Sequence, residues 1–459
     1  MTLTAPATTT RAPAAVNRLT ADDDLFLKLH SLYGNALVNQ LAWRFDEPLP
    51  DAVPTRLHAH LAQGFLARRV HPAPLPFARP YWLPATDSLP LDLATTPVSE
   101  DDVLDWFFDR SRVDFDPATG RVWQLSAAPT SSGGTLVSLV TSHVVSDGGA
   151  VLFAVGDALN RLAAGEEPDR SASSGSLVGV APRNPFRANL SDAAGQTRAI
   201  GRGIRGAIAS RAVTEPARNP RPTRPELPLP PRWAPADLVA QLDLDQWDAA
   251  ARRHQGTTNG LLIALGAGLL GRSGRVGDTA EIRVDVPHSL RGPDDPRANA
   301  TTGLPISVTY RTGEPIDLAA VRAAVKRAAT AYRDPATTPA QQHLQPLQMV
   351  LPRAVLRWFA RTAKAPECLC TNLGESALGV ADFAGHRAAA VLMRPVVCAN
   401  DPAMFRRVEV GVNLSFSTDG RTVTLAVTGA DPDRFPTRAS LREQVTAELA
   451  SWGLVPRYW

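Results

Sequence analysis

The stretch TSHVVSDGGA, residues 141–150, places a histidine, an aspartate and two glycines directly after an apolar run at residues 135–140. A short apolar run of this kind predicts a buried strand over residues 135–141. His143 then stands at the end of that strand, where the hydrogen bonds of a sheet position a side chain better than a free loop does. Gly148 and Gly149 allow the backbone to turn closely into a helix, which we expect over residues 149–164.

His143 is the first candidate for chemistry. A histidine titrates at about pH 6.5, so its side chain can take a proton from a hydroxyl or an amine and return it to a leaving group. Asp147 follows a sharp turn, which favours a structural role over proton transfer. The alternative is a core histidine followed by a turn-forming Asp-Gly pair.

Length and composition restrict the class of protein. The chain has 459 residues, more than one hydrophobic core usually organises, so we expect two or three domains. It is 44% hydrophobic and 20% charged, with a formal net charge of +3. The small net charge does not favour a nucleic-acid partner, and no apolar run is long enough for a transmembrane segment.

Cysteine usage predicts a cytoplasmic protein. The three cysteines are an odd number in a long chain that shows no secretory leader, which argues against a disulfide framework. Cys368 and Cys370 are two residues apart in a strand-like stretch, where both side chains would share one face. We interpret them as buried thiols, and we predict no metal site.

The chain divides into four predicted parts. Residues 1–17, rich in Thr, Ala and Pro, are expected to be a disordered tail, after which Thr20 and Asp23 resemble a helix-capping pair. An N-terminal lobe at 18–170 and a C-terminal lobe at 236–459 alternate helical and extended patterns. Between them, residues 171–235 are a Pro/Arg-rich crossover, with seven prolines in residues 219–236. Further helices are expected at residues 51–67, 101–109, 245–253, 259–271 and 318–333. Further strands are expected at residues 40–45, 237–244, 280–287, 305–311, 407–416 and 422–428.

The sequence resembles a known superfamily at three places in order. HVVSDGG, residues 143–149, resembles the HHxxxDG signature of chloramphenicol acetyltransferase, condensation domains and wax ester synthase/diacylglycerol acyltransferases, with Ser142 in place of the first His. VPHSLR, residues 286–291, followed by Ala298-Asn299, resembles the PVSLR…GN segment of the wax ester synthase branch. CTNLG, residues 370–374, resembles its SNVPG segment.

This resemblance implies an α/β fold of two chloramphenicol acetyltransferase-like lobes with mixed sheets and a tunnel at their interface. His143, within the signature that includes Asp147 and Gly148, would be the catalytic residue. Asp147 would form a bidentate pair with Arg291. Ser142, Asn372 and His288 are the candidate substrate-binding residues. Asn372 either donates to an acyl oxyanion or caps a turn, and His288 either faces the tunnel or is an ordinary strand histidine.

The resemblance also implies an acyltransferase of lipid or secondary-metabolite biosynthesis. The donor would be a thioester of acyl-CoA or of a phosphopantetheinyl carrier protein, the acceptor a small-molecule alcohol or amine, and no cofactor would be tightly bound. One alternative is a non-catalytic condensation-like protein that binds a carrier protein or a small ligand, which the Ser142 replacement favours. A serine hydrolase using Ser142, His143 and Asp147 is disfavoured, because adjacent strand residues point to opposite faces and no G-x-S-x-G elbow occurs.

Overall fold

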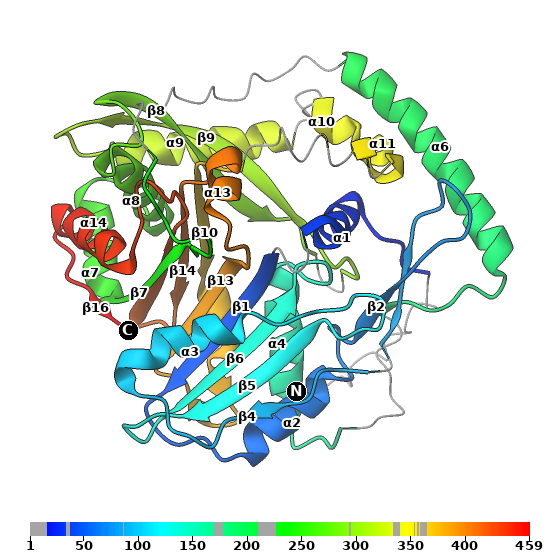
Figure 1. Cartoon of the computed structure of the whole chain (residues 1–459), viewed down its shortest axis with the longest axis horizontal. Helices are drawn as coiled ribbons and strands as arrows, with labels where there is room; N and C mark the ends of the chain where they lie inside the picture. The colour runs from blue at the N-terminus through cyan, green and yellow to red at the C-terminus, as the bar shows by residue number, and fades with distance from the viewer. Residues whose placement is uncertain are drawn as a thin grey trace, which may run out of the picture.

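A five-stranded mixed sheet forms the base of the molecule in the computed structural model (Figure 1). Its strand order is β13-β1-β6-β5-β4, and only the β4–β5 pair is parallel. The strands are β1 (Leu37–Phe45), β4 (Asp92–Leu93), β5 (Trp123–Pro129), β6 (Thr135–Ser142) and β13 (Ala390–Val397). The structure describes residues 16–33, 37–85, 87–168, 178–209, 226–292, 295–333, 340–352, 354–355, 358 and 365–459.

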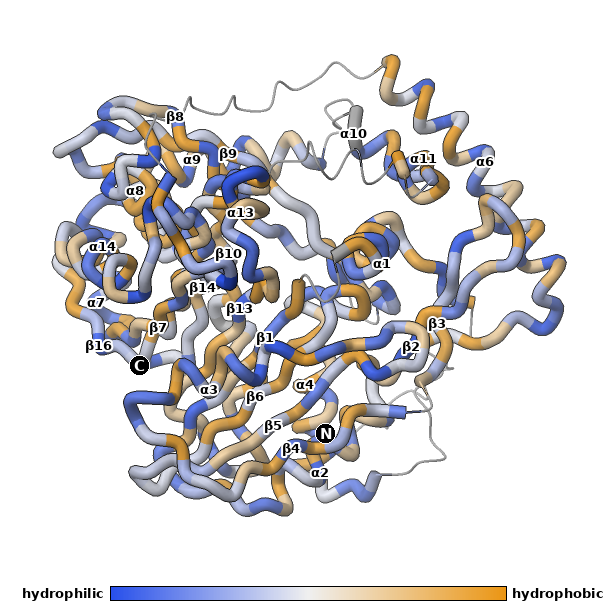
Figure 2. The backbone as a smooth tube through the Cα atoms, viewed as in Figure 1, coloured by the Kyte–Doolittle hydropathy of each residue, from blue (hydrophilic) through white to orange (hydrophobic). Residues whose placement is uncertain are grey.

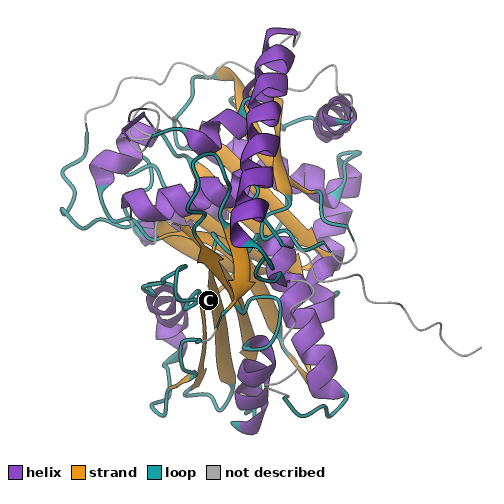
Figure 3. Cartoon of the chain, turned by 90° about the vertical axis from the view of Figure 1, so that its right-hand side faces the viewer, coloured by secondary structure: helices purple, strands orange, loops and turns teal. Residues whose placement is uncertain are grey.

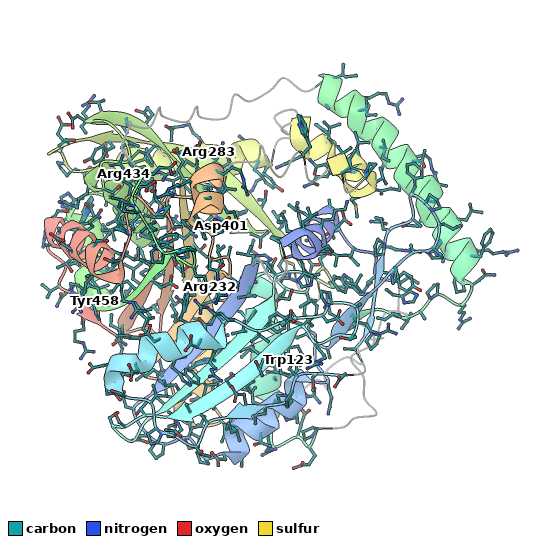
Figure 4. All side chains as sticks on the ribbon, in the orientation of Figure 1. Trp123, Arg232, Arg283, Asp401, Arg434 and Tyr458 are labelled. Atoms are coloured by element: carbon teal, nitrogen blue, oxygen red, sulfur yellow. The ribbon has the colours of Figure 1, made fainter. Side chains whose placement is uncertain are left out.

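The first sheet buries both of its faces. Alternate residues of β1, such as Leu41 and Trp43, pack with α2 (Ala52–Leu61) and α4 (Gly148–Ala163) in one core, into which β5 contributes Trp123 (Figure 4). On the other face, Ala42 packs with α3 (Val103–Arg110), which follows a short 3-10 turn at Glu100–Asp102. This alternation is the period of two that a strand between two layers requires.

The second sheet has seven strands in the order β16-β7-β15-β14-β10-β8-β9, with β10 parallel to both of its neighbours. They are β7 (Ala236–Asp243), β8 (Thr279–Ser289), β9 (Thr301–Arg311), β10 (Cys368–Gly374), β14 (Val412–Thr418), β15 (Thr422–Gly429) and β16 (Arg457–Tyr458). Four helices cover it: α7 (Leu244–Arg253), α8 (Thr258–Arg272), α9 (Leu318–Tyr332) and α14 (Arg438–Ser451). Residues 260–270 of α8 are all buried, which places α8 at the centre of the second core.

The two halves of the sequence are joined by β13, which pairs with β1 although Leu37 and its partner Val397 are 360 positions apart in the sequence. The Arg394 guanidinium on β13 lies 3.0 Å from the Asp237 carboxylate on β7 of the second sheet, and both side chains are buried. Because β13 pairs with β1, part of the predicted C-terminal lobe, residues 236–459, lies in the first sheet. The boundaries of the two lobes stay a prediction. Figure 3 shows the strands of both sheets running through the middle of the molecule with helices outside them.

A third layer of helices lies beside the sheets in Figure 1. It contains α1 (Ala21–Tyr33), α6 (Pro185–Ala209), α10 (Ala340–His343) and α11 (Gln345–Val350). The remaining small elements are β2 (Arg68–His71) with β3 (Tyr81–Pro84), β11 (Asp382–Phe383) with β12 (His386–Arg387), the 3-10 turn η3 (Glu375–Val380) and α13 (Pro402–Val408).

Most of the predicted elements are present, and two predictions are wrong. The helix expected at 51–67 ends at Leu61, where the amides of Gln63 and Gly64 form tighter turns. Residues 407–408 belong to α13 and not to a strand; Asp401 caps this helix and Glu409 ends it in the left-handed conformation. The crossover at 171–235 contains α6, which the sequence did not predict. Residues 1–15 of the expected tail lie outside the described residues.

The capping pair at the first helix is confirmed. The Thr20 amide donates to the Asp23 carboxylate at 2.9 Å, and the Asp23 amide donates to Thr20 Oγ1 at 3.2 Å. Among the described residues, no helix is long and apolar enough to cross a membrane.

Candidate active site

His143 directly follows β6 and is held by its neighbours on the first sheet. Its amide donates to the Leu37 carbonyl at 3.4 Å, and Asn39 on β1 donates through Nδ2 to the Ser146 carbonyl at 2.8 Å. Ser146 Oγ donates to Thr141 Oγ1 at 2.8 Å. The loop between β6 and α4 is therefore attached to β1 and to β6.

Asp147 is the N-cap of α4 and receives four hydrogen bonds. Its Oδ1 accepts from the Ala150 amide at 2.8 Å and from Arg291 Nη2 at 2.9 Å. Its Oδ2 accepts from the Ala300 amide at 2.6 Å and from Thr301 Oγ1 at 2.9 Å. The carboxylate thus joins the His143 loop to the segment around residue 300. Each of its two oxygens accepts two hydrogen bonds from the protein itself.

Arg291 forms the expected pair with Asp147, but the pair is not bidentate. Only Nη2 reaches the carboxylate, because Nη1 donates to the carbonyls of Asp295 and Arg297. Nη2 also donates to the Ala298 carbonyl at 3.1 Å. Arg291 therefore organises residues 295–298 as well as Asp147, and the side chains of Arg291 and Asp147 are only 10% and 4% exposed.

The two glycines of the signature allow two close approaches. A Cβ on Gly148 would lie 3.1 Å from Met393 Cε, and a Cβ on Gly149 would lie 3.4 Å from Arg291 Nε. Met393 belongs to β13 and Arg291 follows β8. The start of α4 is therefore where two segments of the second half of the sequence meet the His143 loop.

Asn299 is a residue of the candidate site to which the sequence assigned no role. Its Nδ2 donates to Asp23 Oδ1 at 2.9 Å and to the His143 carbonyl at 3.1 Å. Its Oδ1 lies 3.0 Å from His143 Nδ1. Because the amide nitrogen faces these two acceptors, the amide oxygen faces the imidazole, and Nδ1 of His143 must carry the proton. The lone pair of the ring is then on Nε2, which is the form that a general base needs.

Asp23 fixes Asn299 from behind. Its Oδ1 accepts from both the amide and the Nδ2 of Asn299 at 2.9 Å, and its side chain is fully buried. Burial raises the pKa of Asp23 above its ordinary value, since desolvation disfavours the charged form. Both residues stand in recognisable sequence patterns, Asp23 in the helix-capping pair with Thr20 and Asn299 in the Ala298-Asn299 motif. Nothing in the sequence indicated that the two meet.

Phe26 covers the imidazole. The two rings are stacked, with centroids 3.8 Å apart and planes 22° apart. Burial lowers the pKa of His143 below its ordinary value, and the nearby Asp147 charge and the Asn299 hydrogen bond only partly oppose this effect. The neutral form of His143 is therefore favoured relative to a solvent-exposed imidazole. The cavity beside it, lined by Phe26, His30 and Ser142 among others, has a volume of about 10 Å³, the space of one water molecule.

The three candidate substrate-binding residues have different surroundings. Ser142 is buried, and its Oγ accepts from the Val144 amide at 3.3 Å, which is a local turn contact and not a nucleophile–base pair. His288 lies on β8 opposite Thr302, one position from the Thr301 that contacts Asp147. Their roles toward substrate remain predictions.

Asn372 lies near the end of β10 and contacts α8. Its Nδ2 donates to Asn259 Oδ1 at 3.3 Å, and its own Oδ1 is buried with no hydrogen-bond partner among the described residues. Only one of the two Nδ2 hydrogens is used in this contact, so the predicted donation to an oxyanion does not require it to open. Among the described residues, no group of three or more His, Cys, Asp or Glu side chains is arranged to hold a metal ion.

Comparison with solved structures defines the fold. No family model matches the chain, and no curated protein matches it. The structure is similar over 95% of this chain to the first condensation domain of the calcium-dependent antibiotic synthetase, with a TM-score of 0.59, 18% identity and 96% of that chain covered. It is also similar to the condensation domain of the monacolin K polyketide synthase, with a TM-score of 0.55, 13% identity, and 96% and 98% of the two chains covered.

A third similar structure is the starter condensation domain of rhizomide synthetase, crystallised with C8-CoA and Leu-SNAC. Its TM-score is 0.55 at 14% identity, over 96% of this chain and 95% of that one. The protein thus has the two-lobed, chloramphenicol acetyltransferase-like fold of condensation domains, as the signature at residues 143–149 predicted. The likeness extends over nearly the whole chain and concerns the fold.

Proposed function

We propose that the protein is an acyltransferase in which His143 acts as the general base. The donor is a thioester of CoA or of a phosphopantetheinyl carrier protein, and the acceptor is a small-molecule alcohol or amine. The observation that carries this proposal is the contact between Asn299 Oδ1 and His143 Nδ1, because it leaves Nε2 unprotonated. The structures crystallised with C8-CoA, which share the fold, support thioesters as the donor class.

The proposed reaction is a direct transfer. Nε2 of His143 takes the proton of the acceptor O–H or N–H while the oxygen or nitrogen attacks the thioester carbonyl. The resulting tetrahedral oxyanion collapses, the C–S bond breaks, and the imidazolium returns the proton to the thiolate. No acyl-enzyme forms. Asp147 and Arg291 have no part in proton transfer, since their polar atoms are engaged in holding the loop.

The burial of His143 suits this role. A base must be unprotonated at the working pH, and desolvation keeps the pKa of His143 below its ordinary value. The buried Asp23–Asn299 pair also holds the ring in one orientation, as a preorganised site requires. The same proposal places the reaction in the biosynthesis of lipids or secondary metabolites.

The test is thiol release from octanoyl-CoA in the presence of a panel of amines and alcohols. Replacing His143 by Ala should lower the rate by about 10²- to 10⁴-fold, the usual effect of losing one general base. His386→Ala is the control, because His386 lies on β12 and has no part in the site described above. Full activity of His143→Ala, or a covalent acyl adduct on Ser142 or a cysteine, would exclude the mechanism.

A non-catalytic binding protein is the second candidate. Two observations favour it: Ser142 replaces the first signature histidine, and Phe26 lies against the imidazole. Such a protein would bind octanoyl-CoA or an acylated carrier protein in calorimetry without releasing thiol with any acceptor. Binding without turnover by the unmodified protein would therefore decide for this alternative.

A further inference from the structure

The outer face of α6 carries four large apolar side chains that point into solvent. The exposed fractions of Phe186, Leu190, Ile204 and Ile208 are 64%, 54%, 41% and 80%. At about 100° per residue these four positions fall within roughly 40° of one another around the helix axis. They therefore lie on one side of α6 as two pairs, one toward each end of the helix, with Thr197 and Gly201 between them; we call this set of four side chains the α6 stripe.

Arginines border this stripe on one side. Arg187, Arg198, Arg202 and Arg205 are exposed, and their positions fall roughly 100–160° around the axis from Phe186. The only acidic residue of the helix, Asp192, lies on the other side, where it accepts from the Arg79 guanidinium at 2.7 Å. The charge that α6 presents to solvent is therefore entirely positive. Figure 2 shows apolar and hydrophilic residues alternating along this helix.

The inner face of α6 is what attaches it to the protein. Gln196 is buried and donates through Nε2 to the Pro346 carbonyl at 3.0 Å on α11. A Cβ on Gly203 or Gly206 would clash with His343 of α10, so the two helices are in close contact. Asn189 accepts from Arg18 at 2.8 Å. The fold thus holds α6 without using the α6 stripe, and the exposed apolar side chains call for another explanation.

The size of the stripe argues for one kind of occupant. A helix of 25 residues is about 37 Å long and about 10 Å wide, so one face offers roughly 400 Å². A stable protein interface needs about 800 Å² from each partner. A single basic amphipathic helix is sufficient, in contrast, for a lipid bilayer, where apolar side chains enter the headgroup boundary and arginines contact anionic headgroups.

We infer that the α6 stripe and its arginines dock the protein on the surface of an anionic lipid bilayer. Figure 1 places α6 at the outer edge of the molecule, so a flat surface reaches it without displacing another described element. The helix α6 packs on α11, and the α11 carbonyls of Gln348 and Met349 accept hydrogen bonds from Lys28 of α1. Lipid docking would therefore also bring the membrane close to α1 and the active site. The inference does not depend on the proposed acyl transfer.

The experiment is cosedimentation of the full chain with sucrose-loaded vesicles, of pure phosphatidylcholine or of equal parts phosphatidylcholine and phosphatidylglycerol. We expect binding to the phosphatidylglycerol vesicles that weakens as salt is added. Each arginine near an anionic surface contributes about fivefold in affinity, so Arg198→Gln/Arg202→Gln/Arg205→Gln should bind on the order of a hundredfold more weakly. Ile204→Glu/Ile208→Glu should abolish binding to both kinds of vesicle.

A matched control has the same change of charge on another helix. Arg322, Lys326 and Arg327 are exposed on α9, and their triple replacement by Gln should leave vesicle binding within about twofold of wild type. Equal loss in both triple variants would overturn the inference, because net charge alone would then explain binding. Equal binding of the wild type to both vesicles would overturn it too. So would a wild-type dimer that Ile204→Glu/Ile208→Glu converts to a monomer, since a second copy would then cover the stripe.

Discussion

The side-chain oxygen of Asn299 lies 3.0 Å from Nδ1 of His143, and this contact decides which nitrogen of the ring carries the proton. The donor end of the same amide is engaged with Asp23 and with the His143 carbonyl, so the amide cannot turn round without facing its oxygen toward a carboxylate. Asp23 therefore fixes the orientation of the Asn299 amide, and that orientation determines the tautomer of His143.

The first prediction concerns that tautomer. In ¹⁵N-labelled protein at neutral pH, long-range proton–nitrogen correlation should show His143 with its proton on Nδ1. Asn299→Ala removes the acceptor and should release the preference for that tautomer, with a fall in kcat smaller than that of His143→Ala. A wild-type spectrum with the proton on Nε2 would contradict both the orientation of Asn299 and the proposed base.

The second prediction is that Asp147 and Arg291 act on stability together. Removing one partner of a buried ion pair leaves the other charge uncompensated, which costs about 3–5 kcal/mol. Asp147→Asn and Arg291→Ala should each lower the free energy of unfolding in urea. The double variant should lose less than the sum, with a coupling energy of about 0.5–3 kcal/mol. Simple addition of the two effects would mean that the 2.9 Å contact contributes nothing of its own.

The third prediction is the pH dependence of the reaction. Only neutral His143 accepts a proton, and burial lowers its pKa from the ordinary value of about 6.5. The value of kcat/KM should therefore rise with pH along a limb whose midpoint is below 6.5, and it should be level at pH 7. A midpoint above 6.5 would show that the imidazole is not desolvated in the working enzyme.

The free energy of unfolding should also depend on pH through the lowered pKa of His143. Between the folded pKa of His143 and about 6.5, the unfolded chain binds a proton that the folded chain does not. The free energy of unfolding should therefore fall as the pH drops through this window. His143→Gln should remove that component, which separates it from the contributions of buried acids such as Asp23.

The fourth prediction is that Phe26 sets the pKa of His143. Replacing Phe26 by Ala removes the ring stacked at 3.8 Å and admits water to the imidazole, so the pKa should rise toward its ordinary value. The midpoint of the pH–rate limb should rise with it. Leu25→Ala is the control, since Leu25 is the adjacent residue of α1 and is 49% exposed. A midpoint that does not change in Phe26→Ala would mean that the stack has no part in desolvation.

The sequence predicted the parts of the site that are local. An apolar run followed by His, Asp and Gly specifies a strand, a turn and a helix within 30 residues, and the structure has β6, the loop and α4 there. Arg291 was identified only through the resemblance, because no local pattern relates it to Asp147. Asn299 and Phe26 approach His143 from 156 and 117 residues away in sequence, and only the assembled fold brings them together.

The formation of α6 and the pairing of β13 also depend on residues that are distant in sequence, so a local pattern does not predict them. Four glycines lower the helix propensity of residues 185–209, yet two of them, Gly203 and Gly206, are required by the close contact with His343. Tertiary packing therefore favours a helix that propensity argues against. For β13, an alternating strand pattern cannot say which sheet it joins. Its pairing with β1 includes a hydrogen bond from Arg394 Nε to Gln40 Oε1 at 3.0 Å, and Arg394 also forms an ion pair with Asp237 of the second sheet.

The fifth prediction concerns the centre of the second core, where α8 crosses β10. A Cβ on Gly266 would lie 2.5 Å from Cys368 Sγ and 2.9 Å from Cys370 Sγ, and both thiols are fully buried. Neither sulfur can move far, because they are 3.6 Å from each other and enclosed by the core. Gly266→Ala should therefore lower the free energy of unfolding by about 1–3 kcal/mol, the usual cost of overpacking.

A paired comparison tests whether steric contact is the cause. Gly277 has no atom within 4 Å of its would-be Cβ and no positive φ, so Gly277→Ala should be neutral or slightly stabilising. In a second step, Cys368→Ala removes the nearer sulfur and should restore part of the stability that Gly266→Ala loses. If the double variant is as unstable as the two single losses added together, the contact between α8 and the thiols is not what makes Gly266 necessary.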